Sequence, residues 1–405
     1  MPDLLVQVDS QVRFSWILLG RSPHNERELY TLYCALLAQG SNLSAADLAR
    51  MVDGPSADSI GWFMRTLEED GRLRQASDAV VDYLRTHKIA LQWGEGLFAS
   101  SDMMSLEATR HLWSARLDPR RRTHAVGSYT HVLDQWPIIY DQPIVLNRRQ
   151  AGAAIEGAMR QRHVELEKLA VDTHGFTHFA MALAKLLGFD LCPQLADLGD
   201  RKLFVPRGIE VPDVLLPITE RLTLGNTARR GWDSLVRIAA SINGGWCSAT
   251  TVLDLYGAAA KGDPAYECGN MLGKLLRTIY LCDLLGNPGF RRELQRVLNQ
   301  GETVHELQRA IHNGPIGARH GRSRQELVAI SGALTLLTNV VMAWNTAQMQ
   351  RLAELRWGSR LPAALARIAP VGFAHINLRG MFNFSLGALH HHLIEAATEP
   401  RMRRA

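Results

Sequence analysis

Apolar residues at helical spacing dominate the first part of the chain. The pattern recurs within residues 29–37, 45–52 and 60–67, and polar residues separate the three segments. Ser44 directly precedes the second segment, and serine is a favoured N-cap residue. These positions predict a helical N-terminal region over residues 1–88.

The pattern changes at Ile89, where helical spacing gives way to extended segments. Residues 89–101 form an apolar stretch that contains Gly94 and Gly96. Residues 126–146 are rich in Val, Ile, Tyr and Thr and are broken by prolines, which is typical of a hairpin or a pair of strands. We therefore expect strands to follow the N-terminal helices.

Helical and extended segments then alternate. Residues 149–162 are rich in alanine and predict a helix, whereas residues 163–172 alternate apolar and acidic side chains as a strand does. Thr177 is placed to cap a helix that ends at Gly188. Residues 202–206 predict one further short strand.

This order of elements predicts an α/β fold (mixed α+β) with a core sheet of the ribonuclease-H type. Residues 89–209 would form the first part of the core, and residues 210–300 a largely helical insertion. Residues 301–385 would supply the helices that complete the core, and residues 386–405 a tail. Sheets of this type present acidic residues at the ends of their central strands.

Composition narrows the class of protein. The formal net charge of +5 permits binding to nucleic acid without requiring it. The five cysteines are widely spaced and include no Cys-x-x-Cys pair, which argues against a disulfide framework and agrees with a reducing cytoplasm. We expect no signal peptide, because no basic segment precedes an apolar core at the N-terminus. Residues 330–344, the most apolar run, are too few to span a membrane and predict a buried helix.

Two aspartates stand where predicted strands end. Asp102 closes the first extended segment, and Asp172 closes the strand that begins at His163. Phosphodiester chemistry on such a sheet uses three acidic groups that hold two divalent ions about 3.5–4 Å apart. Mg²⁺ suits this task because it takes hard oxygen ligands. Aspartate is common at strand ends, so spacing alone favours a structural role for either residue.

Seven blocks of the chain carry a more specific signal. In chain order they are residues 94–102, 129–135, 171–177, 203–206, 298–302, 344–346 and 375–378. Together they resemble the transposases of the replicative class II transposons, the Tn-3 family, from the start of the chain to about residue 385. The first block departs from the usual Gly-Asp-Gly of that family, because Glu95 fills the middle position.

The resemblance implies a metal-dependent DDE catalytic domain, with a ribonuclease-H-like fold and a helical insertion before the last acid. By position, the catalytic and metal-binding triad falls on Asp102, Asp172 and Glu302. These residues would hold two Mg²⁺ ions, for which Mn²⁺ can substitute. His174 lies in the third block and would contact DNA or the active-site phosphate.

The resemblance also implies a function, which is metal-dependent cleavage at transposon ends and transfer of the 3′-hydroxyl into target DNA. The partners would be DNA (terminal inverted repeats and target) and a second copy of the chain, in the bacterial cytoplasm at the nucleoid and with no membrane. We expect at least one of Arg277, Arg292 and Arg309 to contact backbone phosphate.

Family members are roughly twice as long as this chain, and their N-terminal portion recognises the inverted repeats. Two alternative functions therefore remain open. The chain would be either a truncated, inactive transposase remnant that acts as a DNA-binding or dimerising competitor, or a general metal-dependent nuclease.

Three glutamates compete for the third place in the triad: Glu302, Glu306 and Glu326. Glu306 and Glu326 each stand three residues after a threonine or serine, in the pattern of a helix capping box. Glu302 has no such role, because it follows Gly301, which we predict to end the preceding helix. Local sequence therefore favours Glu302 as the catalytic acid.

Overall fold

The structure is a computed structural model that describes residues 1–394 with short gaps. The gaps are residues 42, 69–70, 113, 147–148, 258–259, 313, 317–322, 359 and 379. The last part of the predicted tail, residues 395–405, lies outside the described residues.

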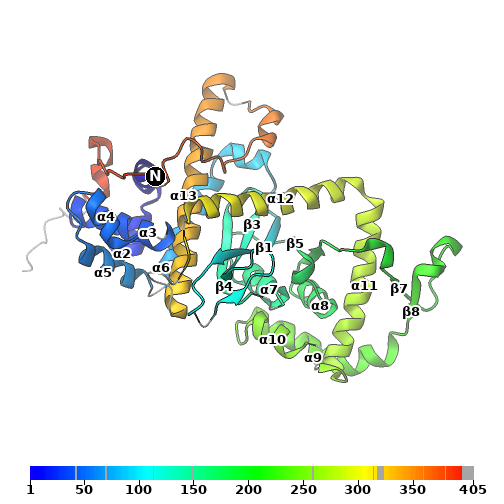
Figure 1. The fold of residues 1–405 in the computed structure, drawn as a ribbon. Helices are drawn as coiled ribbons and strands as arrows, with labels where there is room; N and C mark the ends of the chain where they lie inside the picture. Colours follow the sequence, from blue (N-terminus) through cyan, green and yellow to red (C-terminus); the bar gives the residue numbers. More distant parts are fainter. Residues whose placement is uncertain are drawn as a thin grey trace, which may run out of the picture.

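Short helices make up the N-terminal region, as predicted. They are α1 (Pro2–Val12), α2 (Phe14–Leu19), α3 (Glu26–Ser41), α4 (Ala45–Met51), α5 (Ala57–Leu67) and α6 (Arg72–Arg85). Ser44 caps α4, and its hydroxyl accepts a hydrogen bond from the backbone N–H of Asp47 at 3.0 Å. In Figure 1 these helices gather at one side of the molecule, against the long helix α13 (Arg324–Trp357).

The helix α13 passes through the core of the protein. It is long and apolar enough to cross a membrane, but 83% of its most apolar 18-residue window is buried inside the protein. The buried Asn339 amide donates to the Ser77 hydroxyl and to the Ile138 carbonyl, each at 2.9 Å. The buried helix predicted over residues 330–344 is therefore confirmed, and it extends further in both directions.

A mixed six-stranded sheet forms the centre of the described chain. Its strands are β1 (Phe98–Glu107), β2 (Arg116–Leu117), β3 (His124–Leu133), β4 (Ile138–Ile144), β5 (Lys168–Val171) and β6 (Asp190–Pro193). The strands β1, β3 and β4 are antiparallel neighbours, and β5 and β6 continue on the other side of β1 in parallel with it. The predicted hairpin over residues 126–146 is confirmed, whereas β5 is shorter than the strand predicted over residues 163–172.

Helices cover both faces of this sheet. On one face, the Ser128 hydroxyl of β3 lies 3.1 Å from the Ser331 hydroxyl of α13. On the other face, Nε2 of His131 lies 2.8 Å from the Ala154 carbonyl in the predicted helix α7 (Ala151–Arg160). Because successive strand residues point to opposite faces, β3 is buried on both sides after its first residue.

The segment that follows the sheet is mainly helical. Its helices are α8 (His178–Leu186), α9 (Gly225–Asn243), α10 (Ala249–Leu255), α11 (Pro264–Gly286) and α12 (Pro288–Ile311). Thr177 caps α8 as predicted, with its hydroxyl accepting from the Ala180 N–H at 3.0 Å. The strand predicted over residues 202–206 forms as β7 (Leu203–Pro206), but it pairs with β8 (Thr219–Leu222) in a separate small sheet. Figure 1 shows this small sheet beyond α11, away from the central sheet.

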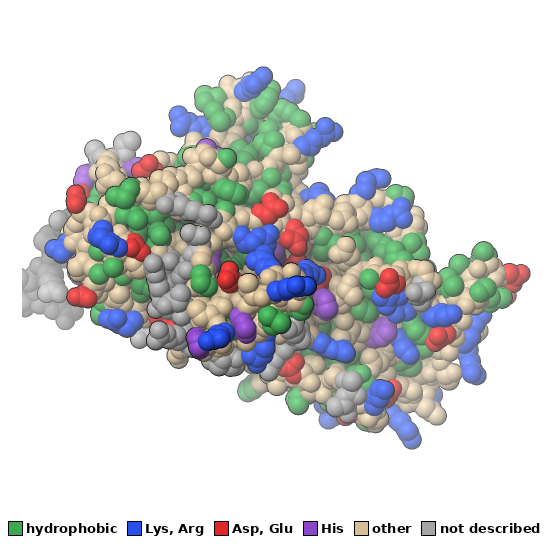
Figure 2. Space-filling view, in the orientation of Figure 1, with side chains coloured by type: hydrophobic (Ala, Val, Ile, Leu, Met, Phe, Trp, Pro, Cys, Tyr) green, Lys and Arg blue, Asp and Glu red, His purple; other side chains and the backbone are tan. Residues whose placement is uncertain are grey.

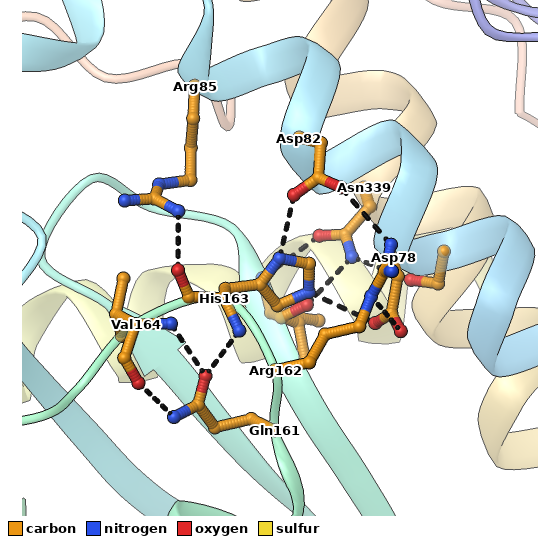
Figure 3. A network of polar contacts seen from close by, with 10 residues as sticks. Asp78, Asp82, Arg85, Gln161, Arg162, His163, Val164 and Asn339 are labelled. Carbon is orange, nitrogen blue, oxygen red and sulfur yellow. Dashed lines mark hydrogen bonds and ion pairs between the residues drawn. The ribbon is translucent and has the colours of Figure 1, made fainter.

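A polar junction joins the N-terminal helices to the central sheet (Figure 3). His163, whose side chain is 1% exposed, contacts Asp82 through Nδ1 at 2.9 Å and Asp78 through Nε2 at 3.0 Å. The neighbouring Arg162 pairs with both aspartates, and Arg85 donates to the His163 carbonyl at 3.0 Å. These bonds fix α6 against the segment that leads into β5.

Candidate active site

The two candidate aspartates lie side by side on neighbouring strands. In the parallel ladder between β1 and β5, Ser101 pairs with Val171, so Asp102 and Asp172 occupy the next position along each strand. Adjacent strands are about 4.8 Å apart, which brings the two carboxylates to one place on the sheet. Asp172 directly follows β5, as predicted.

Asp102 differs from the prediction, because it lies in the middle of its strand. The ladder with β3 continues beyond it, pairing Asp102 with Thr130 and ending at Glu107 opposite Ala125. The buried side chains of Met104 and Leu106 sustain the strand past the aspartate. No local sequence pattern shows that the strand continues past Asp102, because a charged residue usually marks the end of a buried strand.

The third candidate acid arrives on α12, which crosses β1. Gly301 allows the close approach, since a Cβ at this position would lie 2.9 Å from the Ser100 hydroxyl. Glu302 follows, and its carboxylate, that of Asp102 and a ring nitrogen of His305 lie within 4.8 Å of one another. The structure therefore brings Asp102, Asp172 and Glu302 to one site from three separate elements.

The capping argument that selected Glu302 is wrong in part. Gly301 does not end a helix, and Glu302 lies inside α12 with 64% of its side chain exposed. Glu306 forms no capping box, because the Thr303 hydroxyl donates to the Asn299 carbonyl within the same helix. Only the box at Glu326 is confirmed. The glycine that resembled a helix end serves helix-to-strand packing instead.

Burial and the neighbouring negative charges raise the pKa of Asp102 at the place where the acids meet. The pKa of Asp102 is raised to about 7, first because the carboxyl is buried and then because of the negative charge of Asp172. Glu302 raises it further, while the Met103 N–H, which donates to the carboxylate at 2.6 Å, acts in the opposite direction. A divalent cation among these groups would remove the repulsion, so the residues present fit a metal site with oxygen ligands.

Asp172 is oriented by the turn that follows it. One carboxylate oxygen accepts from the Gly175 N–H at 2.8 Å and so caps the short 3₁₀ helix η2 (Thr173–Gly175). Gly175 is needed for this turn, because a Cβ there would lie 2.7 Å from Cβ of Val171. His174 is exposed on the turn, two residues from Asp172. The second oxygen of the carboxylate can still ligate a cation.

His305 belongs to the site and was missed by the sequence analysis. Its Nε2 lies 2.8 Å from the Thr130 hydroxyl, and its Nδ1 lies 4.0 Å from a carboxylate oxygen of Glu302. Burial, followed by the charge of Arg309, lowers the pKa of His305 to about 3, so the ring is neutral at physiological pH. The sequence could have indicated His305, because it stands three residues after Glu302 and residues three apart on a helix are neighbours.

The arginines selected from the sequence lie at different distances from the acids. Arg309 is 4.0 Å from Glu302. Arg292 is exposed on α12, which also carries Glu302. Arg277 is buried away from the site, donates to the Lys202 carbonyl at 2.7 Å and stacks over the ring of Phe204. The structure therefore brings Arg309 to the acids, and Arg292 and Arg277 lie elsewhere.

The first two resembling blocks meet in a loop at the start of β1. The Asp134 carboxylate accepts from the Gly96 N–H at 3.0 Å, and the Gln135 amide donates to the Gly94 carbonyl at 3.0 Å. Glu95 is exposed, so its departure from the family pattern does not disturb these bonds.

Comparison with known proteins identifies the family. Residues 3–382 match the model of the Tn3 transposase DDE domain. The chain belongs to this transposase family. It is 49% identical over 388 residues to the transposase for insertion sequence element IS1071 in transposon Tn5271 of Comamonas testosteroni, covering 95% of this chain and 40% of that relative. It is 27% identical over 385 residues to the transposases of Tn21 from Escherichia coli and of Tn501 from Pseudomonas aeruginosa, covering 93% of this chain and 39% of each.

The predicted resemblance to the Tn-3 family of transposases is therefore confirmed. DDE transposases in general act with divalent metal ions, which agrees with the group formed by Asp102, Glu302 and His305 on β1 and α12. The chain spans about two fifths of the length of the relatives it matches.

Proposed function

We propose that this chain is the catalytic part of a DNA transposase that cleaves transposon ends and joins the freed 3′-hydroxyl to target DNA, as in replicative transposition. The observation that carries the proposal is the convergence of Asp102, Asp172 and Glu302, together with membership of the DDE transposase family.

The arrangement of the strands supports a ribonuclease-H-like core. The central sheet has three antiparallel strands, β4, β3 and β1, followed by β5 and β6 in parallel with β1. Helices cover both faces, and the acids lie on β1, directly after β5, and on α12, which crosses β1. The parallel pairing of β1 with β5 ends at Ser101 and Val171, directly before the two aspartates.

In the proposed mechanism the three acids hold the metal ions, and neighbouring residues position the acids and bind the phosphate. Two Mg²⁺ ions held by the triad would activate the attacking oxygen and stabilise the leaving oxygen. The bond from Gly175 orients Asp172, and the contact between His305 and Thr130 holds α12 against β3 next to Glu302. We propose that the guanidinium group of Arg309, which lies 4.0 Å from Glu302, binds an oxygen of the reacting phosphate.

DNA is the proposed partner, as terminal inverted repeats and target, together with a second copy of the chain in the bacterial cytoplasm. The test is cleavage by the purified chain, with Mg²⁺ or Mn²⁺, of a pre-nicked or branched transposon end and of a random duplex. Asp172→Asn should abolish cleavage at saturating metal, whereas Asp190→Asn, which changes an exposed aspartate on the adjacent strand, should retain it.

The outcomes separate the alternatives. Full cleavage by Asp172→Asn would remove that residue from the site. Equal cleavage of both substrates would favour a general metal-dependent nuclease. DNA binding without cleavage, even with the N-terminal portion of a relative supplied, would favour an inactive competitor.

A further inference from the structure

An arginine-rich hollow lies beside the candidate active site. It has a volume of about 440 Å³ and is bordered by α12, by the turn between β3 and β4, and by the 3₁₀ helix η6 (Ala363–Arg367). Arg292 and Arg296 line it from α12, Arg367 from η6 and Trp136 from the turn. Its described lining residues include no aspartate or glutamate. We call it the α12 hollow.

The positive charge of the α12 hollow is only partly compensated by neighbouring acidic groups. Arg296 donates to the Trp93 carbonyl and also lies near Asp134, so part of its charge is compensated. Arg292 and Arg367 are exposed, and neither forms an ion pair with another described residue. Figure 2 shows basic side chains gathered around the course of α12 on this face, with a few acidic ones among them. Such a concentration of guanidinium groups favours an anionic ligand.

The turn that carries Trp136 is strained and firmly held. Trp136 has a φ of 88°, a conformation that bulky residues rarely adopt. The Gln300 amide donates to the Asp134 carbonyl at 3.2 Å, and Arg85 donates to the Gln135 side chain at 3.0 Å. These bonds hold the turn in place despite the strain, and strained residues of this kind concentrate at ligand sites.

Two residues that line the α12 hollow each carry a buried polar atom that has no hydrogen-bond partner among the described residues. Trp136 is 8% exposed and Gln300 is 5% exposed, and both line the hollow. The indole Nε1 of Trp136 and the amide Oε1 of Gln300 are buried without a hydrogen bond among the described residues. Buried polar atoms of a folded protein normally have partners, so an unpaired donor beside three arginines points to a ligand that accepts hydrogen bonds.

We propose that the α12 hollow binds the phosphodiester backbone of the DNA strand that leads to the acidic residues. The proposal rests on the proposed function and adds Trp136, Arg296 and Arg367 to the DNA-contacting surface. Thr303, which also lines the hollow, directly follows Glu302, so the hollow adjoins the site. Arg292 lies near its other end, and at about 1.5 Å per residue the lining part of α12 matches about four or five nucleotides of one duplex strand.

The chemistry of the lining side chains fits backbone phosphate. Guanidinium groups bind phosphate oxygens through paired N–H donors, which a single lysine does not offer. The amides of Gln295 and Asn299 line the same surface of α12 and supply neutral donors of the kind that position DNA without reading its sequence. The hollow should therefore bind DNA of any sequence.

The test is equilibrium binding of a fluorescent random-sequence duplex, in EDTA and at increasing salt, so that no metal or cleavage contributes. The double variant Arg292→Gln/Arg367→Gln should lower the slope of log affinity against log salt by about 2, because each lost phosphate contact contributes about 0.9. The control, Arg291→Gln/Arg360→Gln, removes one exposed arginine of α12 and one that precedes η6, both outside the hollow, and should change the slope by less than half as much.

A second variant tests the turn itself. Trp136→Phe keeps an aromatic ring and removes the indole N–H, so it should weaken DNA binding severalfold at a temperature at which its unfolding curve shows the variant to be fully folded, even if the smaller ring lowers its stability. Equal losses of slope in the two double variants would overturn the inference and leave the proposed function intact. Wild-type protein that fails to bind DNA at any salt concentration would overturn both.

Discussion

Substituting Asp102 by Asn should stabilise the metal-free protein while abolishing cleavage. The pKa of this carboxyl rises from 3.8 to about 7 in the folded state, first because of burial and then because of the charge of Asp172. The folded protein therefore binds a proton that the unfolded chain has already released. Stability falls as the pH rises from about 4 to about 7 and then levels off.

The size of the effect follows from the shift in pKa. A shift of about 3 pH units corresponds to about 4 kcal/mol, and partial solvent exposure reduces this figure, so we expect about 2–4 kcal/mol at pH 8. Asn keeps the side-chain oxygen that accepts from the Met103 N–H, so the substitution removes the charge and little else. For 405 residues that unfold as one unit, the melting temperature should rise by about 2–5 °C.

The assay is thermal unfolding in EDTA between pH 5 and pH 8. The difference between Asp102→Asn and the wild type should grow with pH, and adding Mg²⁺ should stabilise the wild type more than the variant. Asp233→Asn, at an exposed position in α9, is the control and should show no such trend. A constant difference across the pH range would refute the argument, because it would show that the Asp102 carboxyl is not destabilised by its surroundings.

Other predictions follow from the position of α12, from charge and from packing. Glu302→Gln should abolish metal-dependent cleavage and Glu306→Gln should retain most of it; the reverse result would remove Glu302 from the triad. Binding of the chain to duplex DNA should weaken steeply with salt and differ little between end and random sequences, and strong preference for one end in an anisotropy titration would contradict this. Gly157→Ala would place a methyl group 2.0 Å from the His131 ring and should destabilise the protein by about 1–3 kcal/mol in urea unfolding. Gly286→Ala, where a methyl group meets no atom within 4 Å, should be neutral or mildly stabilising, so equal effects of the two alanines would refute the packing argument.

Local patterns in the sequence determined much of the fold. The helices of the N-terminal region, the hairpin of β3 and β4, the buried helix α13, and the caps at Thr177 and Ser323 all form as predicted. Each depends on side chains within a few residues of one another, and such short-range patterns are readable from a single sequence. Asp172 was placed at the end of its strand for the same reason.

Only the tertiary structure decided how the site is assembled. The position of Glu302 depends on α12 crossing β1, which the absence of a side chain at Gly301 permits next to Ser100. Glycine is common both at helix ends and where a helix packs closely against a strand, and the neighbouring residues do not distinguish the two cases. The prediction that Gly301 ends a helix was therefore wrong. His305 gains its role only through Thr130 on a different element, because contacts between distant segments leave no periodic trace in the chain.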